Sequence, residues 1–234
     1  MNPYLIGLVL LAQTPQAKLD EATKRSRVLD TLRELGARMT FDTEQTDRPL
    51  VRLQLEGPKV TDEVMPLLRH FLNLHTLYLT GTRVTDKGLA ELRYHKNIQV
   101  LFLTYSARIT DKGVARLAGM TRLETLGLSY TAVGDEALTT LAGLKELNWL
   151  ALSHTQVSDA NLGQLRKLAN LQYLFLDGTH ITTKSLDQLK TMPLLTLSYI
   201  DTRAVVDGVD GFQKRSPPVK PREPAKPPES KEPG

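Results

Sequence analysis

The chain has 234 residues, of which 41% are hydrophobic and 24% charged, and its formal net charge is +4. The end from Gln213 carries +3 of that charge, with six Lys or Arg against three Glu, so the rest is almost neutral and lacks the basic excess of a nucleic-acid binder. The absence of cysteine excludes disulfides, thiol chemistry and Cys-ligated zinc.

Residues 1–13 contain the long apolar run of the chain, Tyr4 to Ala12. This run is too short to span a bilayer, so we expect no transmembrane segment. It resembles the apolar centre of a secretory signal, although no Lys or Arg precedes it and no Ala-x-Ala site follows. The alternative is the start of a capping helix. We favour export to the cell envelope over a cytoplasmic location, and both stay open.

Residues 14–49 have the pattern of a cap for a repeat array. Thr14 and Pro15 form a helix-start pair, apolar residues follow at helical spacing, and Gly36 stands where helices commonly end. A short strand is predicted over 38–41, and a polar turn follows it. A solenoid needs such a cap, because its end face is apolar and its end strand is an unpaired edge.

Residues 50–207 repeat one phrase about six times and end in a capping strand. The opening residues lie 24, 24, 25, 24, 24 and 24 positions apart. Each phrase begins with the alternation of a half-buried strand and continues with apolar residues at helical spacing. Repeats of this length stack into a solenoid, because no unit can bury its apolar face alone. The opening residues are Leu50, Leu74, Ile98, Leu123, Leu147, Leu171 and Leu195.

Two polar positions recur within these repeats. A Thr near the ninth place is expected to turn inward and to satisfy loop backbone groups with its hydroxyl. An Asp stands at each helix start, where a carboxylate complements the positive helix end, so we interpret the Asp series as structural and not catalytic. The Thr series is Thr82, Thr131, Thr155 and Thr179, and the Asp series is Asp62, Asp86, Asp111, Asp135, Asp159 and Asp207.

Residues 208–234 form a proline-rich tail. From Gln213 it has seven prolines in 22 residues, a composition that predicts an extended, disordered segment. Its PxxP steps, such as Pro218 to Pro221, are typical of polyproline ligands. A spacer or solubilising tail is the alternative.

The phrases GTRVTDKGLAEL and ARITDKGVARL resemble the leucine-rich repeats, in the kind that has roughly 24–26 residues per unit. This kind is found in F-box receptors of ubiquitin ligases and in bacterial, notably planctomycete-like, arrays of unassigned function. The resemblance, over about residues 28–207, implies an α/β right-handed horseshoe with a parallel concave sheet and convex helices, and it implies protein binding. No F-box-like segment is expected before the repeats, so a ubiquitin-ligase adaptor is a weak alternative. Internalin-like adhesins are a looser match, because they have shorter repeats with Asn where this chain has Thr.

On such a horseshoe the strand positions that leave the core point to the concave face. Eight of the thirteen aromatic residues fall there, and exposed aromatic clusters are typical of binding surfaces. Gly127 and Ala151 are small, so we expect a shallow depression between Phe102 and Phe175. The predicted site for a protein or peptide partner is Tyr78, Phe102, Tyr105, Gly127, Tyr130, Trp149, Ala151, His154, Tyr173, Phe175 and Tyr199.

Other interpretations are kept beside this one. The rings could only stiffen the sheet, or they could bind a carbohydrate. The five histidines lack metal-ligand spacing, and no nucleophile elbow or phosphate loop is present, so we expect no enzyme, no metal and no cofactor. The oligomeric state is left open.

Overall fold

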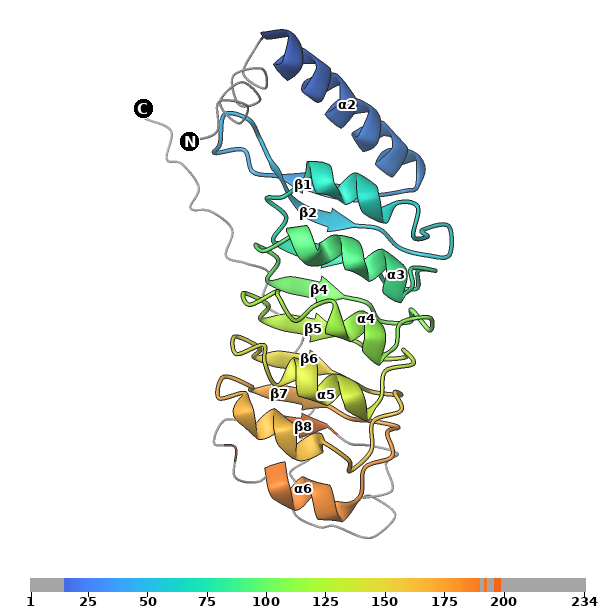
Figure 1. Ribbon diagram of the computed structural model, residues 1–234, viewed down its shortest axis with the longest axis vertical. Coiled ribbons are helices and arrows are strands. Elements are labelled where there is room, and N and C mark those ends of the chain that lie inside the picture. Colours follow the sequence, from blue (N-terminus) through green and yellow to red (C-terminus); the bar gives the residue numbers. More distant parts are fainter. Residues whose placement is uncertain (1–14, 190–191, 193–195, 199–234) are drawn as a thin grey trace, which may run out of the picture.

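The protein is an elongated stack of repeats with its helices on one side of a single sheet (Figure 1). The structure, a computed structural model, describes residues 15–189, 192 and 196–198. The predicted signal segment, Tyr199, Asp207 and the tail therefore lie outside the described residues. The strands are β1 (Arg38–Phe41), β2 (Leu50–Gln54), β3 (Thr76–Tyr78), β4 (Val100–Phe102), β5 (Thr125–Gly127), β6 (Trp149–Ala151), β7 (Tyr173–Phe175) and β8 (Thr196–Ser198).

The cap consists of one long helix and one antiparallel strand. Helix α2 (Pro15–Glu34) begins at the proline, and Gly36 follows its end with a φ of +80°, a left-handed conformation that suits glycine. Leu32 of this helix is completely buried in the core. Strand β1 pairs antiparallel with β2, so the first repeat strand is not left as a bare edge.

The remaining strands are parallel and share one register. Strands β2 to β6 each contribute a leucine that faces the helices, and the register aligns Leu53, Leu77, Leu101, Leu126 and Leu150. All five are fully buried. The core is therefore a leucine ladder that runs the length of the stack, as the repeat period predicted.

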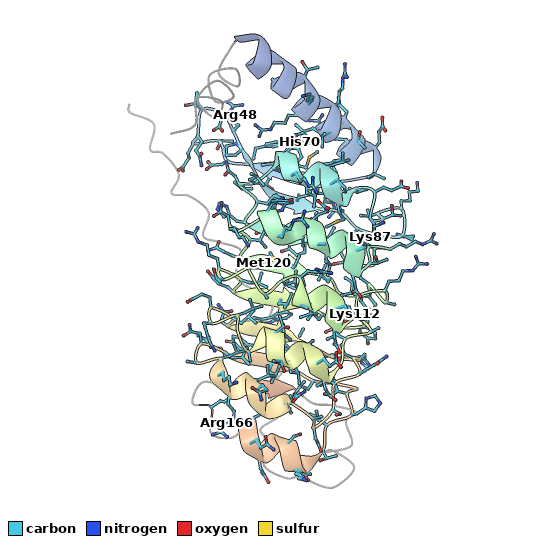
Figure 2. All side chains as sticks on the ribbon, viewed as in Figure 1. Arg48, His70, Lys87, Lys112, Met120 and Arg166 are labelled. Atoms are coloured by element: carbon cyan, nitrogen blue, oxygen red, sulfur yellow. The ribbon has the colours of Figure 1, made fainter. Side chains whose placement is uncertain are left out.

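The helical side differs in part from the expected row of α-helices, because several segments are 3₁₀ helices. Short segments suit the 3₁₀ conformation, whose tighter hydrogen bonds are tolerated over a few residues. Lys87 and Lys112, at equivalent places of successive repeats, lie one above the other at the same edge (Figure 2). The segments are η1 (Met65–His70), α3 (Asp86–Leu89), η2 (Ala90–Tyr94), α4 (Asp111–Ala115), α5 (Asp135–Leu141), η3 (Leu162–Lys167) and α6 (Thr183–Leu189).

The threonine series turns inward, as predicted. Thr131 donates its hydroxyl to the Leu128 carbonyl at 2.6 Å, and Thr155 makes the same bond to Leu152 at 2.6 Å. Ser106 holds this place in the longer third repeat and donates to the Leu79 carbonyl of the repeat before it at 3.0 Å. These hydroxyls satisfy loop carbonyls in the buried interior.

The aspartate series is structural, but its partners lie in the next repeat. The Asp86 carboxylate accepts two hydrogen bonds from Thr110, one from its backbone amide at 2.8 Å and one from its hydroxyl at 2.6 Å. The Thr110 hydroxyl in turn accepts from the Lys112 amide at the start of α4. A Cβ at Gly113 would collide with the Asp86 carboxylate, which explains the glycine in the T-D-K-G phrase. Each carboxylate thus ties one repeat to the next.

Candidate functional site

The first row of rings, the strand row, consists of Tyr78, Phe102, Trp149 and Phe175. Side chains alternate along a strand, so these rings lie on the sheet face opposite the leucine ladder. Tyr78 and Phe102 occupy matching places on β3 and β4, and their rings stack 5.2 Å apart at an interplanar angle of 6°. Register alone brings these two rings together.

The strand row then crosses β5 without a ring from that strand. Phe102 and Trp149 lie on β4 and β6, yet their ring centroids are 5.4 Å apart. Gly127 pairs with Phe102 in register and contributes no side chain. Trp149 continues the row to Phe175, at 5.1 Å.

The expected depression at Gly127 and Ala151 is therefore wrong. Both residues are buried, Ala151 with 6% of its surface exposed. A Cβ at Gly127 would lie 2.5 Å from Cδ1 of Phe102, because that ring lies over the glycine. The neighbouring ring fills the space that small residues leave, since an open void forfeits packing contacts.

A second row of rings, the loop row, consists of Tyr105, Tyr130 and His154. It lies in the loops that follow β4, β5 and β6. The Tyr105 and Tyr130 rings stack 4.4 Å apart, and Tyr130 stacks on His154 at 4.3 Å. The row is continuous over three repeats.

The loop row has left-handed backbone. The φ angles are +63° at Tyr105, +58° at Tyr130 and +54° at His154. Such a conformation costs a non-glycine residue roughly 1–2 kcal/mol. The same place in other repeats is taken by Gly57, Gly81 and Gly178, all with positive φ. This backbone was not anticipated from the sequence, although glycine at the eighth place of those repeats was the available signal.

Exposure separates the two rows. Tyr105 is 58% exposed and Tyr130 is 40% exposed, whereas the rings of the strand row are half-buried. Tyr173 lies beside Trp149 in register and is half-buried. The loop row is thus the part of the predicted site that offers most surface to a partner.

Polar side chains lie beside the loop row and pair with one another. Ser153 donates its hydroxyl to Asp177 Oδ2 at 3.2 Å. The His154 ring stacks on Tyr130 and covers Gly178, where a Cβ would collide with it. Partial desolvation, reinforced by the Tyr105 phenol and Asp177, raises the pKa of Tyr130, so its hydroxyl stays protonated and able to donate.

Neither a metal-binding cluster nor a membrane-spanning helix occurs in the part of the chain that the structure describes. No group of three or more His, Asp or Glu side chains there could hold a metal ion. No helix in the described ranges has the length and apolar character needed to cross a membrane.

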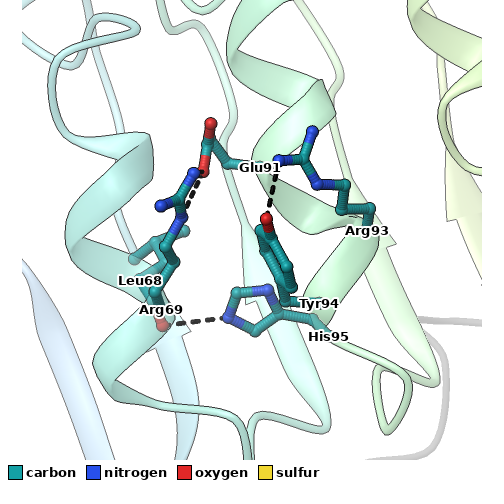
Figure 3. A network of polar contacts seen from close by, with 6 residues as sticks. All are labelled: Leu68, Arg69, Glu91, Arg93, Tyr94 and His95. Carbon is teal, nitrogen blue, oxygen red and sulfur yellow. Dashed lines mark hydrogen bonds and ion pairs between the residues drawn. The ribbon is translucent and has the colours of Figure 1, made fainter.

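A polar cluster lies on the helical side, on η1 and η2 (Figure 3). Arg69 Nε donates to Glu91 at 2.5 Å, and the Arg93 guanidinium donates to the Tyr94 hydroxyl at 2.6 Å. The guanidinium carbons of both arginines lie within 5.0 Å of the Tyr94 ring centroid. These groups satisfy one another at the surface, as structural side chains do.

His95 lies beneath this cluster and is completely buried. Its Nε2 lies 2.9 Å from the Leu68 carbonyl of the preceding repeat, which assigns the proton to Nε2. The Nδ1 atom has no hydrogen-bond partner within the described residues. Burial lowers the pKa of His95, so the ring is neutral. Leu144 and Leu168 hold this place in later repeats, which makes His95 a core residue.

The fold and the two rows define an α/β repeat solenoid that presents side chains on a surface. Residues 72–92 match the family model described as leucine-rich repeat. Internalin C2 from Listeria monocytogenes is similar in structure, with 25% identity and a TM-score of 0.52 over 66% of this chain and 73% of that one. A second internalin of that organism has 22% identity and a TM-score of 0.46, over 58% of this chain and 44% of the other. No curated protein sequence matches.

The chain thus has the leucine-rich-repeat fold, and one of its repeats matches the family model. Proteins of this fold typically serve as binding scaffolds, so the general role of this chain is protein interaction.

Proposed function

We propose that the loop row and the strand row together form a non-catalytic recognition surface on the concave side, which captures a protein or peptide partner. The observation that carries this proposal is the pair Tyr105 and Tyr130, two exposed rings on left-handed backbone. Strained residues of this kind cluster at functional sites, because a fold without a use for them would lose the strain.

Stiffening of the sheet explains the strand row but not the loop row. Tyr78, Phe102 and Trp149 are half-buried and pack on one another, so they contribute to stability wherever a partner binds. Tyr105 and Tyr130 gain stacking of about 0.5–1.5 kcal/mol from each other, which is no more than the strain of their backbone. Glycine would serve the fold as well at both places, as it does at Gly81.

The chemistry of the surface suits a peptide better than a sugar. A sugar ring stacks on the free face of an aromatic ring, whereas here the faces of Tyr105, Tyr130 and His154 are turned to one another. What the loop row offers is ring edges and phenol hydroxyls. Tyrosine in this role contributes large contact area at low entropic cost.

The test uses a variant that removes a ring without a cost to the fold. Tyr130→Gly relieves left-handed strain and loses two stacking contacts, so we expect its thermal midpoint to stay within a few degrees of the wild type. Tyr94→Ala removes an exposed tyrosine from the helical side and is the matched control.

Peptides would be selected on the wild-type chain from a displayed random library. We expect their Kd to rise at least tenfold on Tyr130→Gly and to stay unchanged on Tyr94→Ala. Peptides that bind both variants equally, or a selection that yields no binder, would contradict the proposal.

A further inference from the structure

The proline-rich tail has a regularity that matches the aromatic rows. Pro218, Pro221, Pro224 and Pro227 follow one another at every third residue. A polyproline II helix has three residues per turn and rises about 3.1 Å per residue, so these four prolines share one edge about 9.3 Å apart. In that conformation, the tail would present a straight apolar edge of four prolines over three turns.

The spacing of the solenoid fits this edge. Both rows run across the strands, and parallel strands lie roughly 4.8 Å apart. Two strand spacings amount to about 9.6 Å, which agrees with one polyproline II turn to within a few tenths of an ångström. The rings of the loop row have a spacing close to that of the strands, with centroids 4.4 Å and 4.3 Å apart. In the loop row, every second ring would meet the same kind of proline contact.

The polar groups beside the rings also suit this ligand. A polyproline II helix makes no internal hydrogen bonds, so its carbonyls need donors. The phenols of Tyr105 and Tyr130 hydrogen-bond to each other, which leaves one phenol proton and the hydroxyl of Thr104 to donate. Thr104 lies on this face, because its Oγ1 would be 3.0 Å from a Cβ at Gly127. Residues 213–234 carry six Lys or Arg against three Glu, and the Asp177 carboxylate lies beside the loop row.

The tail can reach the whole face. Twenty residue steps lead from Ser198, the end of β8, to Pro218. Fully extended, they span at most about 72 Å. The eight-stranded sheet measures about 34 Å across its strands, so no part of either row is out of range. A tethered ligand of this kind has an effective concentration in roughly the millimolar range.

We propose that residues 217–228 of this chain bind its own aromatic rows as a polyproline II helix laid across the strands. This proposal rests on the proposed function, because it names a ligand for the same recognition surface. The tail covers the rows within one molecule, and an external partner must displace it or offer proline at the same spacing.

The experiment uses full-length chains and the intrinsic reporter Trp149, the single tryptophan. In one variant Pro218, Pro221, Pro224 and Pro227 are all replaced by Ala, which breaks the proline edge and keeps every charge. A synthetic peptide of residues 213–234 is titrated into this variant and into the wild type, with Trp149 emission and heat as readouts.

We expect the peptide to saturate the four-proline variant and to bind the wild type at least tenfold more weakly, since the tail in cis competes. Adding Tyr105→Gly and Tyr130→Gly to the variant should weaken binding at least tenfold, whereas Tyr94→Ala should leave it unchanged. The same peptide with its four prolines replaced by Ala is the charge-matched control and should not bind.

Three results would overturn the proposal. The peptide could fail to bind the four-proline variant, or the Ala peptide could bind equally well and show that charge alone acts. Sedimentation velocity could instead show a dimer in the wild type that the four-proline variant lacks, which would give the tail to a second copy. The proposed function can hold even if this inference fails. In that case library-selected peptides would still bind the four-proline variant, and their binding would depend on Tyr130.

Discussion

The rings of Phe102 and Trp149 pack 5.4 Å apart from strands that are not neighbours, because Gly127 on the strand between them has no side chain. A single glycine therefore makes the strand row continuous. The contact depends on the size of a residue in a third strand.

Gly127→Ala should break this contact. The new Cβ would lie 2.5 Å from Cδ1 of Phe102, so the ring must move. Overpacking of this kind costs about 1–3 kcal/mol, and we expect loss of that order in urea unfolding together with a shift of Trp149 emission. Gly119→Ala is the control, since its new Cβ would meet only the end of the flexible Lys96 side chain. An unchanged emission spectrum in Gly127→Ala would show that the Phe102 ring does not hold this position.

Asp86→Ala should weaken the contact between two repeats and lower the free energy of unfolding. It leaves the Thr110 amide and hydroxyl without their acceptor, and an unpaired, partly buried donor costs about 1–3 kcal/mol. Asp111→Ala should cost less, because Asp111 accepts the amide of Gly134, which has no hydroxyl. Urea unfolding of both variants, with the exposed Asp47→Ala as control, checks this order. Equal losses at all three places would contradict the cross-repeat role of the carboxylates.

Asp159 should make stability depend on pH in the acid range. Burial acts to raise its pKa, but hydrogen bonds from Ser185 and Thr182 outweigh burial and hold the pKa below the ordinary 3.8. A lowered carboxylate pKa stabilises the fold above the unfolded value, and this contribution disappears as the pH falls through the folded value. Asp159→Asn should therefore be less stable than the wild type at pH 7, with the gap closing below about pH 4. A gap that stays constant from pH 7 to pH 3 would refute the assignment.

His95 should make stability depend on pH in a higher range. Burial lowers its pKa below the ordinary 6.5, so below that pH the unfolded chain takes up a proton that the folded chain refuses. Stability from this source is complete above the unfolded pKa and declines as the pH falls below it. In His95→Leu this decline should vanish, while Leu68 keeps a partner because its carbonyl also accepts the Phe71 amide at 2.8 Å. Thermal midpoints of both chains between pH 5 and pH 8 provide the measurement; parallel curves would contradict the prediction.

The repeat period predicted the strands, the buried leucines and the inward threonines, because these are properties of one unit copied along the chain. Thr131 and Thr155 make the same bond for the same local reason. The helix before the repeats was equally readable, since Pro15 and Gly36 are local signals of helix start and end.

The sequence predicted which residues lie on the sheet face opposite the leucine ladder, but it did not predict which side chains they contact. Which ring touches which depends on the residue one or two repeats away, as the contact of Phe102 with Trp149 across Gly127 shows. The Asp86 carboxylate reaches Thr110 for the same reason, because the helix starts of stacked repeats lie side by side.

The sequence by itself determined a leucine-rich solenoid with rings on one face of its sheet. Only the tertiary structure decided that those rings close into two rows, that the predicted depression is filled, and that Tyr105, Tyr130 and His154 hold left-handed backbone. The physical reason is that hydrophobic periodicity is a property of one repeat, whereas ring packing and backbone strain arise from contacts between repeats about 24 residues apart in the chain.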